Sequence, residues 1–535
     1  MIFEISVFLT PEEEKSGDSV DKIILREIRK NHKDIQKKDY SATLIKRSVD
    51  ARRKNIRIFH KYQIRTGTDK NQNNYFKPSW QKTGGKGPVV HIAGAGPAGL
   101  FCALELLEKG IKPVIIEQGT DPSERKIHIA GISRTGTINP NSNFCFGLGG
   151  AGTFSDGKLF TRSGKRGNIQ KVLEILNFHG AQNSILTASH PHIGTDILPG
   201  VITGIKETIL KHGGEFLLNT ELEDFSISEK NGRKFLEEIT IKDLKTGEEK
   251  TVKSGNLVLA TGHSRESIYT LMLEKGGKEA LEAKGFACGA RIEHPRELID
   301  RIQFHNNPPK GFSGAEYRLT TQVEGRGVYS FCMCPGGVVV PSASSNGEIV
   351  VNGMSPSSRN SPWSNSALVV EIRPQDYQDS GENPLSGLFF RKSIEKRAFQ
   401  ETQCQKAPAQ RVTDFLKGAL SKTLPKSSYT PGLFSSDLNT WLPEIISRRL
   451  KTALYDFDRK MQGFITEEAV LIAPETRTST PVRIIRDGET RESLVRGIYP
   501  AGEGSGYAGG IVSSALDGIN TAIVLAQKIR SITTQ

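Results

Sequence analysis

The sequence has few cysteines and no long hydrophobic run. Its 535 residues include six cysteines, spread without the regular spacing of a disulfide framework. No apolar stretch approaches the roughly 20 residues that cross a bilayer. The first nine residues include an acid and no basic leader, so we expect no signal peptide. These absences predict a protein of the reducing cytoplasm that has no membrane partner.

What is present is an ordinary globular composition with an excess of positive charge. Hydrophobic residues make up 36% and charged residues 24% of the chain, which excludes a disordered protein. The length predicts about two to four domains. Of the net charge of +13, much lies in residues 1–88, which hold 20 Lys and Arg against 11 Asp and Glu. Such a concentration either attracts a polyanion or forms a solvated surface.

The N-terminal segment has a pattern of its own. Residues 2–9 alternate like a strand, residues 20–31 place apolar side chains at helical spacing, and a second strand-like run lies near residues 56–59. Residues 1–65 are therefore predicted to form a small basic α+β module. Residues 66–88 are polar and lack periodicity, which predicts a linker.

A glycine-rich turn between two strands predicts a dinucleotide site. Residues 89–93 are a buried-strand run, residues 100–107 an apolar helix and residues 113–116 the next strand, so the crossover should be parallel and right-handed. The turn matches G-x-G-x-x-G, whose glycines permit a tight turn, the approach of a pyrophosphate and close packing of helix on strand. The helix N-terminus adds N–H groups for the phosphates. The predicted contacts are Gly94, Gly96, Pro97, Ala98 and Gly99.

An acid at the end of the second strand completes this unit. Glu117 follows Gly99 by 18 residues, and a carboxylate there can accept hydrogen bonds from ribose hydroxyls. The adjacent Gln118 belongs to the same predicted site. The alternative is a strand-end acid that faces water.

Two later segments resemble motifs of FAD enzymes of the glutathione-reductase-like superfamily. Residues 260–262 are similar to the strand end where the chain leaves the FAD domain, and residues 497–511 to a strand, an acid, a glycine-rich turn and a helix start. The resemblance implies FAD rather than NAD, with the acid on the ribityl chain and the helix N-terminus stabilising a reduced flavin. The residues it implicates are Ala260, Thr261, Gly262, Gly502, Glu503, Gly509, Gly510 and Ile511.

Longer strings resemble the bacterial FAD-dependent dehydrogenase family, also called NAD(FAD)-utilising. They span residues 146–159, 191–196, 260–264, 291–295, 331–337, 475–479 and 502–510. The resemblance covers essentially the whole chain and implies an α/β fold. In it, residues 89–267 and 471–535 form one discontinuous Rossmann-type FAD-binding domain, and residues 268–470 form an inserted α+β domain that caps the flavin. It supplies no reaction, because fold analogy supports a cofactor and not a substrate.

The loop at residues 149–158 is rich in small residues, which allow backbone N–H groups to crowd a phosphate or the flavin ring. The alternatives are a tight structural loop and, for its lysine, an ordinary surface position. The predicted contacts are Gly149, Gly150, Ala151, Gly152, Thr153, Ser155, Asp156 and Lys158.

Four side chains are candidates for catalysis. His192 and His263 can move protons near neutral pH, or they are structural histidines satisfied by local groups. Cys332 and Cys334 flank Met333, and on a strand both thiols would share a face and could pass electrons to flavin. The alternative is a pair of buried structural cysteines, since a CxC disulfide ring is strained. We predict no metal site, because zinc needs more ligands than this segment offers.

The leading hypothesis is an FAD-dependent oxidoreductase that acts on a small molecule under the inserted domain. The chain holds a single complete G-x-G-x-x-G context, so a second Rossmann domain for NAD(P)H is not evident, although NAD(P)H remains a candidate electron donor. One alternative is a flavoprotein that binds or modifies RNA through its basic N-terminal module, whose sequence lacks interleaved aromatic residues. Another is a protein in which FAD is purely structural.

Overall fold

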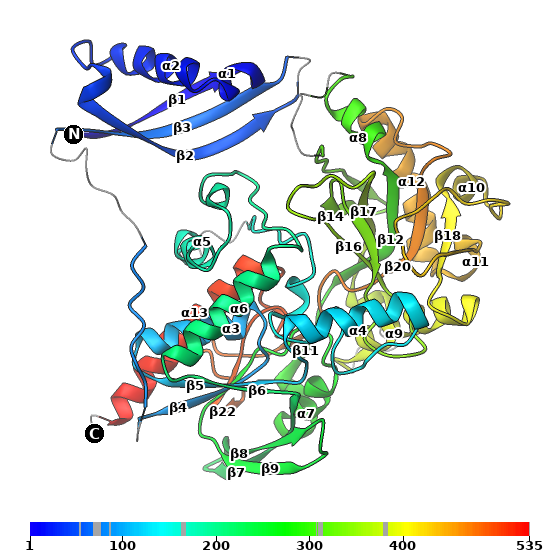
Figure 1. Ribbon diagram of the computed structural model, residues 1–535. Helices are drawn as coiled ribbons and strands as arrows, with labels where there is room; N and C mark the ends of the chain where they lie inside the picture. The colour runs from blue at the N-terminus through cyan, green and yellow to red at the C-terminus, as the bar shows by residue number, and fades with distance from the viewer. Residues whose placement is uncertain are drawn as a thin grey trace.

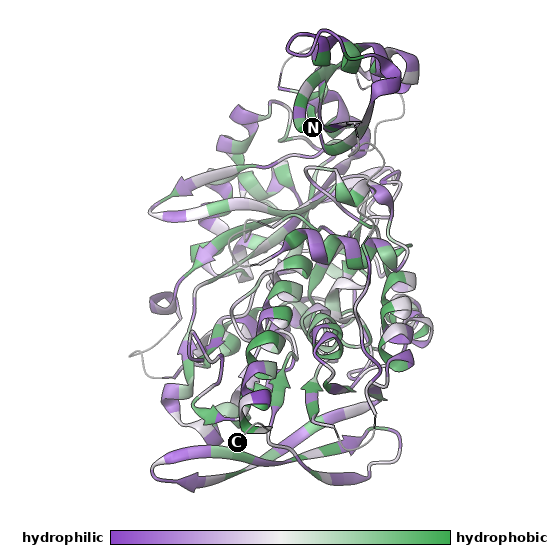
Figure 2. Cartoon of the chain, turned by 90° about the vertical axis from the view of Figure 1, so that its left-hand side faces the viewer, coloured by the Kyte–Doolittle hydropathy of each residue, from purple (hydrophilic) through white to green (hydrophobic). Residues whose placement is uncertain are grey.

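The computed structural model describes residues 1–52, 55–67, 76–84, 87–161, 167–306, 308, 314–377 and 383–533. The chain passes from a small N-terminal module to a domain around a parallel sheet, interrupted by a domain around a mixed sheet (Figure 1). The N-terminal module and the C-terminus lie at opposite ends of the molecule (Figure 2). Among the helices in these ranges, none has the length and apolar character needed to cross a membrane.

The N-terminal module is an antiparallel sheet with two helices on one face (Figure 1). β1 (Ile2–Leu9), β3 (Arg57–Thr66) and β2 (Tyr40–Asp50) lie in that order, and α1 (Pro11–Lys15) and α2 (Gly17–Arg29) follow β1. The sequence pattern fails to predict β2, because its residues are mostly polar and only partly buried, which weakens the alternation. The backbone of Arg47 in β2 exchanges hydrogen bonds of 2.8 Å with Thr187 and Ser189, and these attach the module to the next domain.

A five-stranded parallel sheet forms the centre of that domain, in the order β23-β10-β4-β5-β6. Because β23 returns from the far end of the chain to pair with β10, segments on both sides of the insertion build one sheet. Helix α3 (Pro97–Glu108) makes the crossover from β4 to β5. The predicted Rossmann-type α/β fold is therefore confirmed. The strands are β4 (Val89–Ala93), β5 (Lys112–Glu117), β6 (Glu215–Leu218), β10 (Leu257–Leu259) and β23 (Ile498–Pro500).

Helices cover one face of the parallel sheet and a second sheet covers the other. α13 (Ile511–Thr533) packs against α3, beside α5 (Ile169–Phe178) and α6 (Leu198–Lys211). The contact of α13 with α3 requires glycine, since a Cβ on Gly518 would lie 2.0 Å from the carbonyl oxygen of Ala98. The second sheet buries Phe225 and Ile239 against the opposite face. Its strands are β7 (Thr220–Lys230), β8 (Arg233–Asp243), β9 (Glu249–Lys253) and β22 (Val495–Arg496).

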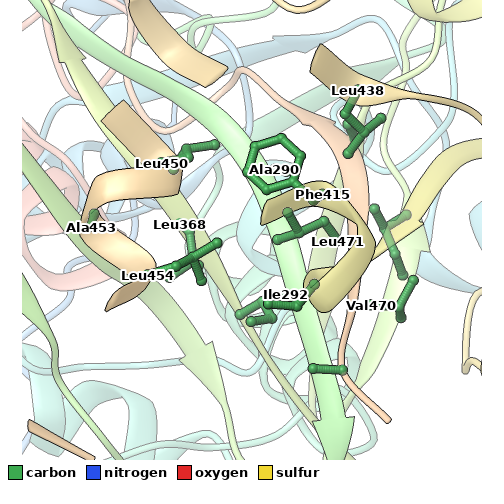
Figure 3. Close-up of a cluster of buried hydrophobic side chains, with 14 of the residues drawn as sticks. Ala290, Ile292, Leu368, Phe415, Leu438, Leu450, Ala453, Leu454, Val470 and Leu471 are labelled. Carbon is green, nitrogen blue, oxygen red and sulfur yellow. The ribbon is translucent and has the colours of Figure 1, made fainter. Parts of the chain in front are cut away.

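The inserted domain is built on a seven-stranded mixed sheet in the order β13-β14-β17-β12-β20-β18-β19. The strands are β12 (Phe286–Pro295), β13 (Thr320–Val323), β14 (Arg326–Cys334), β17 (Trp363–Ile372), β18 (Ala407–Arg411), β19 (Leu433–Ser435) and β20 (Val470–Glu475). Phe415, Leu450 and Leu454 from helices pack on Ile292 and Leu368 of the sheet (Figure 3). The helices are α8 (Arg296–Gln303), α9 (Ser386–Thr402), α10 (Val412–Lys417), α11 (Leu438–Trp441) and α12 (Glu444–Lys460).

The remaining elements lie where the two domains meet. The chain leaves the parallel sheet through α7 (Ser267–Gly276) and β11 (Leu281–Ala283), and it returns through β21 (Val482–Ile484), which pairs with β11. Helix α4 (Pro122–Thr135) and the hairpin of β15 (Val338–Pro341) and β16 (Val351–Met354) face each other across a small apolar cluster.

Candidate functional site

A cleft of about 370 Å³ at the carboxyl ends of the parallel strands gathers most residues that the sequence implicates, a size and a place typical of ligand sites. The implicated residues that line it are Gly94, Gly96, Pro97, Ala98, Glu117, Gln118, Gly150, Ala151, Gly152, Ser155, Asp156, Lys158, Ala260, Thr261, Gly262, His263, Cys332, Gly502, Glu503, Gly509, Gly510 and Ile511. Those outside the lining are Gly99, Gly149, Thr153, His192 and Cys334.

The three motif glycines meet different surroundings. Gly94 has a φ of +103°, and a Cβ there would lie 2.3 Å from the carbonyl oxygen of Ala260. A Cβ on Gly99 would lie 2.0 Å from the carbonyl oxygen of Gly94, so both positions exclude a side chain for packing reasons. At Gly96 the nearest atom to a Cβ is the Cα of Gly150 at 3.9 Å, and the space beside it belongs to the cleft.

The N-terminus of α3 opens onto this space. Its cap residue, Gly96, has no side chain and makes no side-chain cap, and Pro97 and Ala98 of the first turn line the cleft. Uncapped N–H groups and the positive end of the helix dipole suit an anion. The residues present therefore fit a pyrophosphate beside Gly96.

Glu117 joins the glycine turn to two neighbouring segments of the backbone. Its buried carboxylate accepts hydrogen bonds from the backbone N–H groups of Ala95 and Gly119 at 2.9 Å and of Gly147 at 3.0 Å. The alternative of a water-facing acid therefore does not hold. A carboxylate has about four acceptor positions, so one stays available to a ribose hydroxyl from the cleft.

The loop after α4 is held by an arginine that the sequence does not reveal. Arg125 is fully buried, and burial lowers its pKa to about 10, so it stays charged at neutral pH. Because its partners are main-chain groups, no sequence pattern marks this role. Its guanidinium donates five hydrogen bonds of 2.7–3.3 Å to the carbonyl oxygens of Asn143, Phe144, Gly147, Leu148 and Gly150.

This loop lies directly on the glycine turn. The N–H of Gly149 donates to the carbonyl oxygen of Ala95 at 2.9 Å, and a Cβ on Gly150 would lie 3.0 Å from the Cα of Gly96. The hydroxyl of Thr153 donates a hydrogen bond to the carbonyl oxygen of Leu148 at 3.1 Å. Gly149 and Thr153 therefore shape the loop, and their neighbours line the cleft.

At the other end of the cleft, the two remaining glycine segments touch. A Cβ on Gly504 would lie 2.2 Å from the carbonyl oxygen of Gly262, so this contact also depends on glycine. Glu503 lines the cleft between them, and burial raises its pKa to about 7 against the opposing charge of Lys284. A carboxyl group here can accept or donate a hydrogen bond near neutral pH.

The CxC sequence ends strand β14 at the side of the cleft formed by the inserted domain. Cys332 lines the cleft and Cys334 is fully buried, so the two residues of the pair differ in their access to the cleft. The physical reason is the left-handed backbone of Cys332, with a φ of +48°, which interrupts the strand's alternation. The ammonium of Lys158 lies 3.6 Å from the sulfur of Cys334 and 3.2 Å from a carboxylate oxygen of Asp156.

Known proteins match this chain along nearly its full length. A family described as "FAD binding domain" matches residues 87–141, and one described as "FAD-dependent protein, C-terminal domain-like" matches residues 285–478. An "Uncharacterized protein" of Clostridium beijerinckii is 40% identical over 533 residues, which cover 95% of this chain and 96% of that protein. The chain belongs to the FAD-dependent protein family. Its dinucleotide is accordingly FAD.

The solved structures to which this chain is similar are more distant in sequence. A flavoprotein/dehydrogenase from Cytophaga hutchinsonii is 10% identical, with 83% of this chain and 79% of that one covered and a TM-score of 0.36. The E. coli quinol fumarate reductase FrdA is 12% identical, with 84% and 71% covered and a TM-score of 0.34.

The two candidate histidines of this FAD-dependent protein are both neutral at neutral pH. Burial together with Arg391 and Arg477 lowers the pKa of His263, in the cleft, to about 3. His192 lies outside the lining with its Nε2 atom 3.2 Å from the carbonyl oxygen of Ser357, and burial and Arg359 lower its pKa as well. Its placement corresponds to the alternative of a histidine satisfied by the backbone.

The inserted domain adds further side chains to the FAD cleft, and its sheet includes β20, part of which the predicted boundary at residue 471 assigns to the FAD-binding domain. Glu475 lies at the end of β20, where the guanidinium of Arg291 binds it at 2.8 Å. Asn352 and Phe331 line the same side. Arg477 also reaches the cleft, but its guanidinium is already neutralised by a bidentate contact with Glu395, at 2.7 and 3.1 Å.

His294 gives the fold a pH dependence that can be measured. It is fully buried, its Nε2 atom lies 2.9 Å from the carbonyl oxygen of Phe464, and burial lowers its pKa from 6.5 to about 4. The unfolded chain therefore binds a proton that the folded one does not, and stability present above pH 6.5 is lost as the pH falls toward 4.

We therefore expect wild type to lose about 2 kcal/mol more unfolding free energy than His294→Gln between about pH 7 and pH 5. Urea denaturation of both proteins at the two pH values measures this difference. Equal losses would contradict the assignment.

Proposed function

We propose that this protein is an FAD-dependent oxidoreductase whose small-molecule substrate binds between FAD and the inserted domain. The observation that carries the proposal is the two-sided cleft. The glycine turn, Glu117 and the start of α13 line one side, while Cys332, Asn352 and Glu475 of the inserted domain line the other. When bound, FAD supplies reversible hydride and electron transfer.

Each part of the cleft has a proposed role. The turn at Gly96 and the first turn of α3 would hold the pyrophosphate, and Glu117 the adenosine ribose. Glu503 would hydrogen-bond the ribityl chain, and the loop at residues 149–158 with the N-terminus of α13 would contact the flavin half. The finer assignment to the glutathione-reductase-like superfamily is part of this proposal, and the order of the three motifs along the chain supports it.

A spectral titration of the purified protein tests the proposal. We expect bound FAD with an absorbance band at about 450 nm, and anaerobic bleaching of this band by NADH or NADPH if either is the electron donor. A protein that neither retains nor rebinds FAD would overturn the proposal. If the flavin stays oxidised after addition of NADH and of NADPH, neither nucleotide is the electron donor. The proposed oxidoreductase function would still stand, because a substrate could reduce the flavin.

The other two hypotheses predict different results. A purely structural FAD would be reduced by dithionite and by no small-molecule donor. The RNA-binding hypothesis predicts salt-dependent retention of RNA that is lost on deletion of residues 1–80. It stays a prediction, since neither the family nor the cleft supplies an observation in its favour.

A further inference from the structure

We propose that Cys332 and Cys334 form a dithiol–disulfide couple that exchanges two electrons with FAD and acts on small thiols or disulfides. This inference rests on the proposed function, because FAD is the redox partner of the couple. It names the substrate class that the cleft would take. Three features support it: the place of Cys332, the backbone that joins the two residues, and the charges around Cys334.

The first feature is the place of Cys332. It lines the cleft together with Phe331 and Lys158, and it belongs to the inserted domain, whereas the glycine turn belongs to the parallel-sheet domain. Cys334 is fully buried and is not among the residues that line the cleft. A molecule in the cleft can therefore reach Cys332 and not Cys334, which is the division expected between an exchanging and a resolving cysteine.

The second feature is a curled backbone. Cys332 adopts a left-handed φ of +48°, which is unfavourable for a residue with a side chain and persists only where the surroundings impose it. The pairing of β14 with β17 shifts register between Phe331 and Cys334, as in a β-bulge. As a result, the sulfur of Cys334 reaches back to the carbonyl oxygen of Cys332 at 3.3 Å.

An arginine imposes this backbone. The guanidinium of Arg291 donates to the carbonyl oxygen of Cys332 at 2.7 Å, and it is held in turn by Glu475 at 2.8 Å and Asn365 at 2.6 Å. Arg291 itself is fully buried. Its guanidinium therefore contacts both residues of the pair, at the carbonyl oxygen of Cys332 and at the sulfur of Cys334.

The third feature is the charge around Cys334. The ammonium of Lys158 and the guanidinium of Arg291 each lie 3.6 Å from its sulfur. Cations beside the sulfur of Cys334 stabilise its thiolate, which is the attacking form when Cys334 resolves a mixed disulfide at Cys332 and the leaving form when the protein disulfide is opened at Cys332. Asp156, at 3.2 Å from Lys158, keeps that cation in place.

The chemistry of the couple balances. Oxidation breaks two S–H bonds, forms one S–S bond and releases two electrons and two protons, which oxidised FAD takes up in becoming its two-electron reduced form. In the other direction, the protein disulfide would take two electrons and two protons from reduced FAD and become the dithiol. The sulfur of Cys332, as a thiolate, then attacks a substrate disulfide and expels one thiol. The thiolate of Cys334 then attacks the mixed disulfide at Cys332 and expels the second thiol, which leaves the protein disulfide.

Mass spectrometry of the FAD-loaded protein tests the couple without an activity assay. Trypsin should release residues 327–359 as one peptide, which contains Cys332 and Cys334 and no other cysteine. From air-oxidised protein we expect this peptide to be about 2 Da lighter than its reduced form and to resist alkylation. After treatment with dithiothreitol it should accept two alkyl groups.

A second measurement follows the rate at which the flavin is reduced. We expect anaerobic dithiothreitol to bleach the flavin of wild type at least about 10-fold faster than that of Cys332→Ser or Cys334→Ser. Cys404→Ser is the matched control, since this exposed cysteine lies outside the cleft, and it should behave as wild type. Cys145 also lines the cleft, and its separate tryptic peptide shows whether it takes part.

The outcomes separate this inference from the proposed function. Two alkylated cysteines in the air-oxidised peptide, with equal bleaching in all variants, would overturn the couple while FAD reduction by other donors still stood. If the serine variants lose FAD, their flavin cannot be followed. The mass and alkylation state of the wild-type peptide 327–359 then decide whether the disulfide forms. A protein that binds no FAD overturns both.

Discussion

Replacing Arg125 by methionine should lower the free energy of unfolding by about 4–6 kcal/mol and abolish the retention of FAD. Five buried carbonyl oxygens lose their donor, at about 1–3 kcal/mol for each group left unsatisfied and less than additively for neighbours. Methionine keeps much of the side-chain volume, so the loss reports hydrogen bonds more than a cavity. Without Arg125, the loop at residues 149–158 should leave the glycine turn.

Denaturant unfolding and the FAD-to-protein ratio after gel filtration measure both effects. Arg125→Lys keeps the charge with three donors instead of five, so an intermediate loss is expected. Arg134→Met is the matched control, because Arg134 is exposed on the same helix. It should cost less than about 1 kcal/mol. Wild-type stability and FAD content in Arg125→Met would show that other contacts hold the loop.

Gly96→Val should weaken FAD binding about 1000-fold, or about 4 kcal/mol, and leave the apoprotein folded. The backbone of Gly96 has a φ of −76°, which valine adopts readily, and the atom nearest to its Cβ is 3.9 Å away. The branched side chain would occupy the room beside the first turn of α3 that the pyrophosphate needs. The substitution should therefore weaken the binding of FAD without lowering the free energy of unfolding of the apoprotein.

Fluorescence titration of the apoprotein with FAD, together with circular dichroism, separates these two effects. Gly200→Ala is a suitable control, because a Cβ on this residue of α6 meets nothing within 4 Å and should stabilise the helix by about 0.5–1 kcal/mol. Gly99→Ala should instead disrupt the fold, with its Cβ 2.0 Å from a carbonyl oxygen. Normal affinity in Gly96→Val would mean that the pyrophosphate lies elsewhere.

The part of the site that the sequence predicts is the part built from local patterns. Gly94, Gly96 and Glu117 lie within one strand–turn–helix–strand unit, where spacing and periodicity fix geometry. The grouping of this unit with residues 260–262 and 502–511 came from resemblance, since nothing local shows that β23 pairs with β10. The cleft brings the three segments together.

Contacts made by the main chain, or by segments distant in the sequence, escape such prediction. Arg125 binds five carbonyl oxygens, which every residue carries, so no partner residue type reveals its role. Cys332 and Cys334 show the same limit. Strand periodicity places them on one face, but the buried cation of Arg291, 41 residues away along the chain, holds the carbonyl of Cys332 and accompanies a left-handed backbone.

The return of β23 and α13 to the parallel sheet has a consequence for synthesis on the ribosome. The face of α3 that α13 covers is complete as a sequence by residue 108, while α13 ends at residue 533. At about 5–20 residues per second, that apolar face waits some 20–85 s for its partner. During this interval the nascent chain exposes an apolar surface that favours aggregation. The N-terminus of α13, which lines the cleft, joins the FAD site only after the rest of that site has been synthesised.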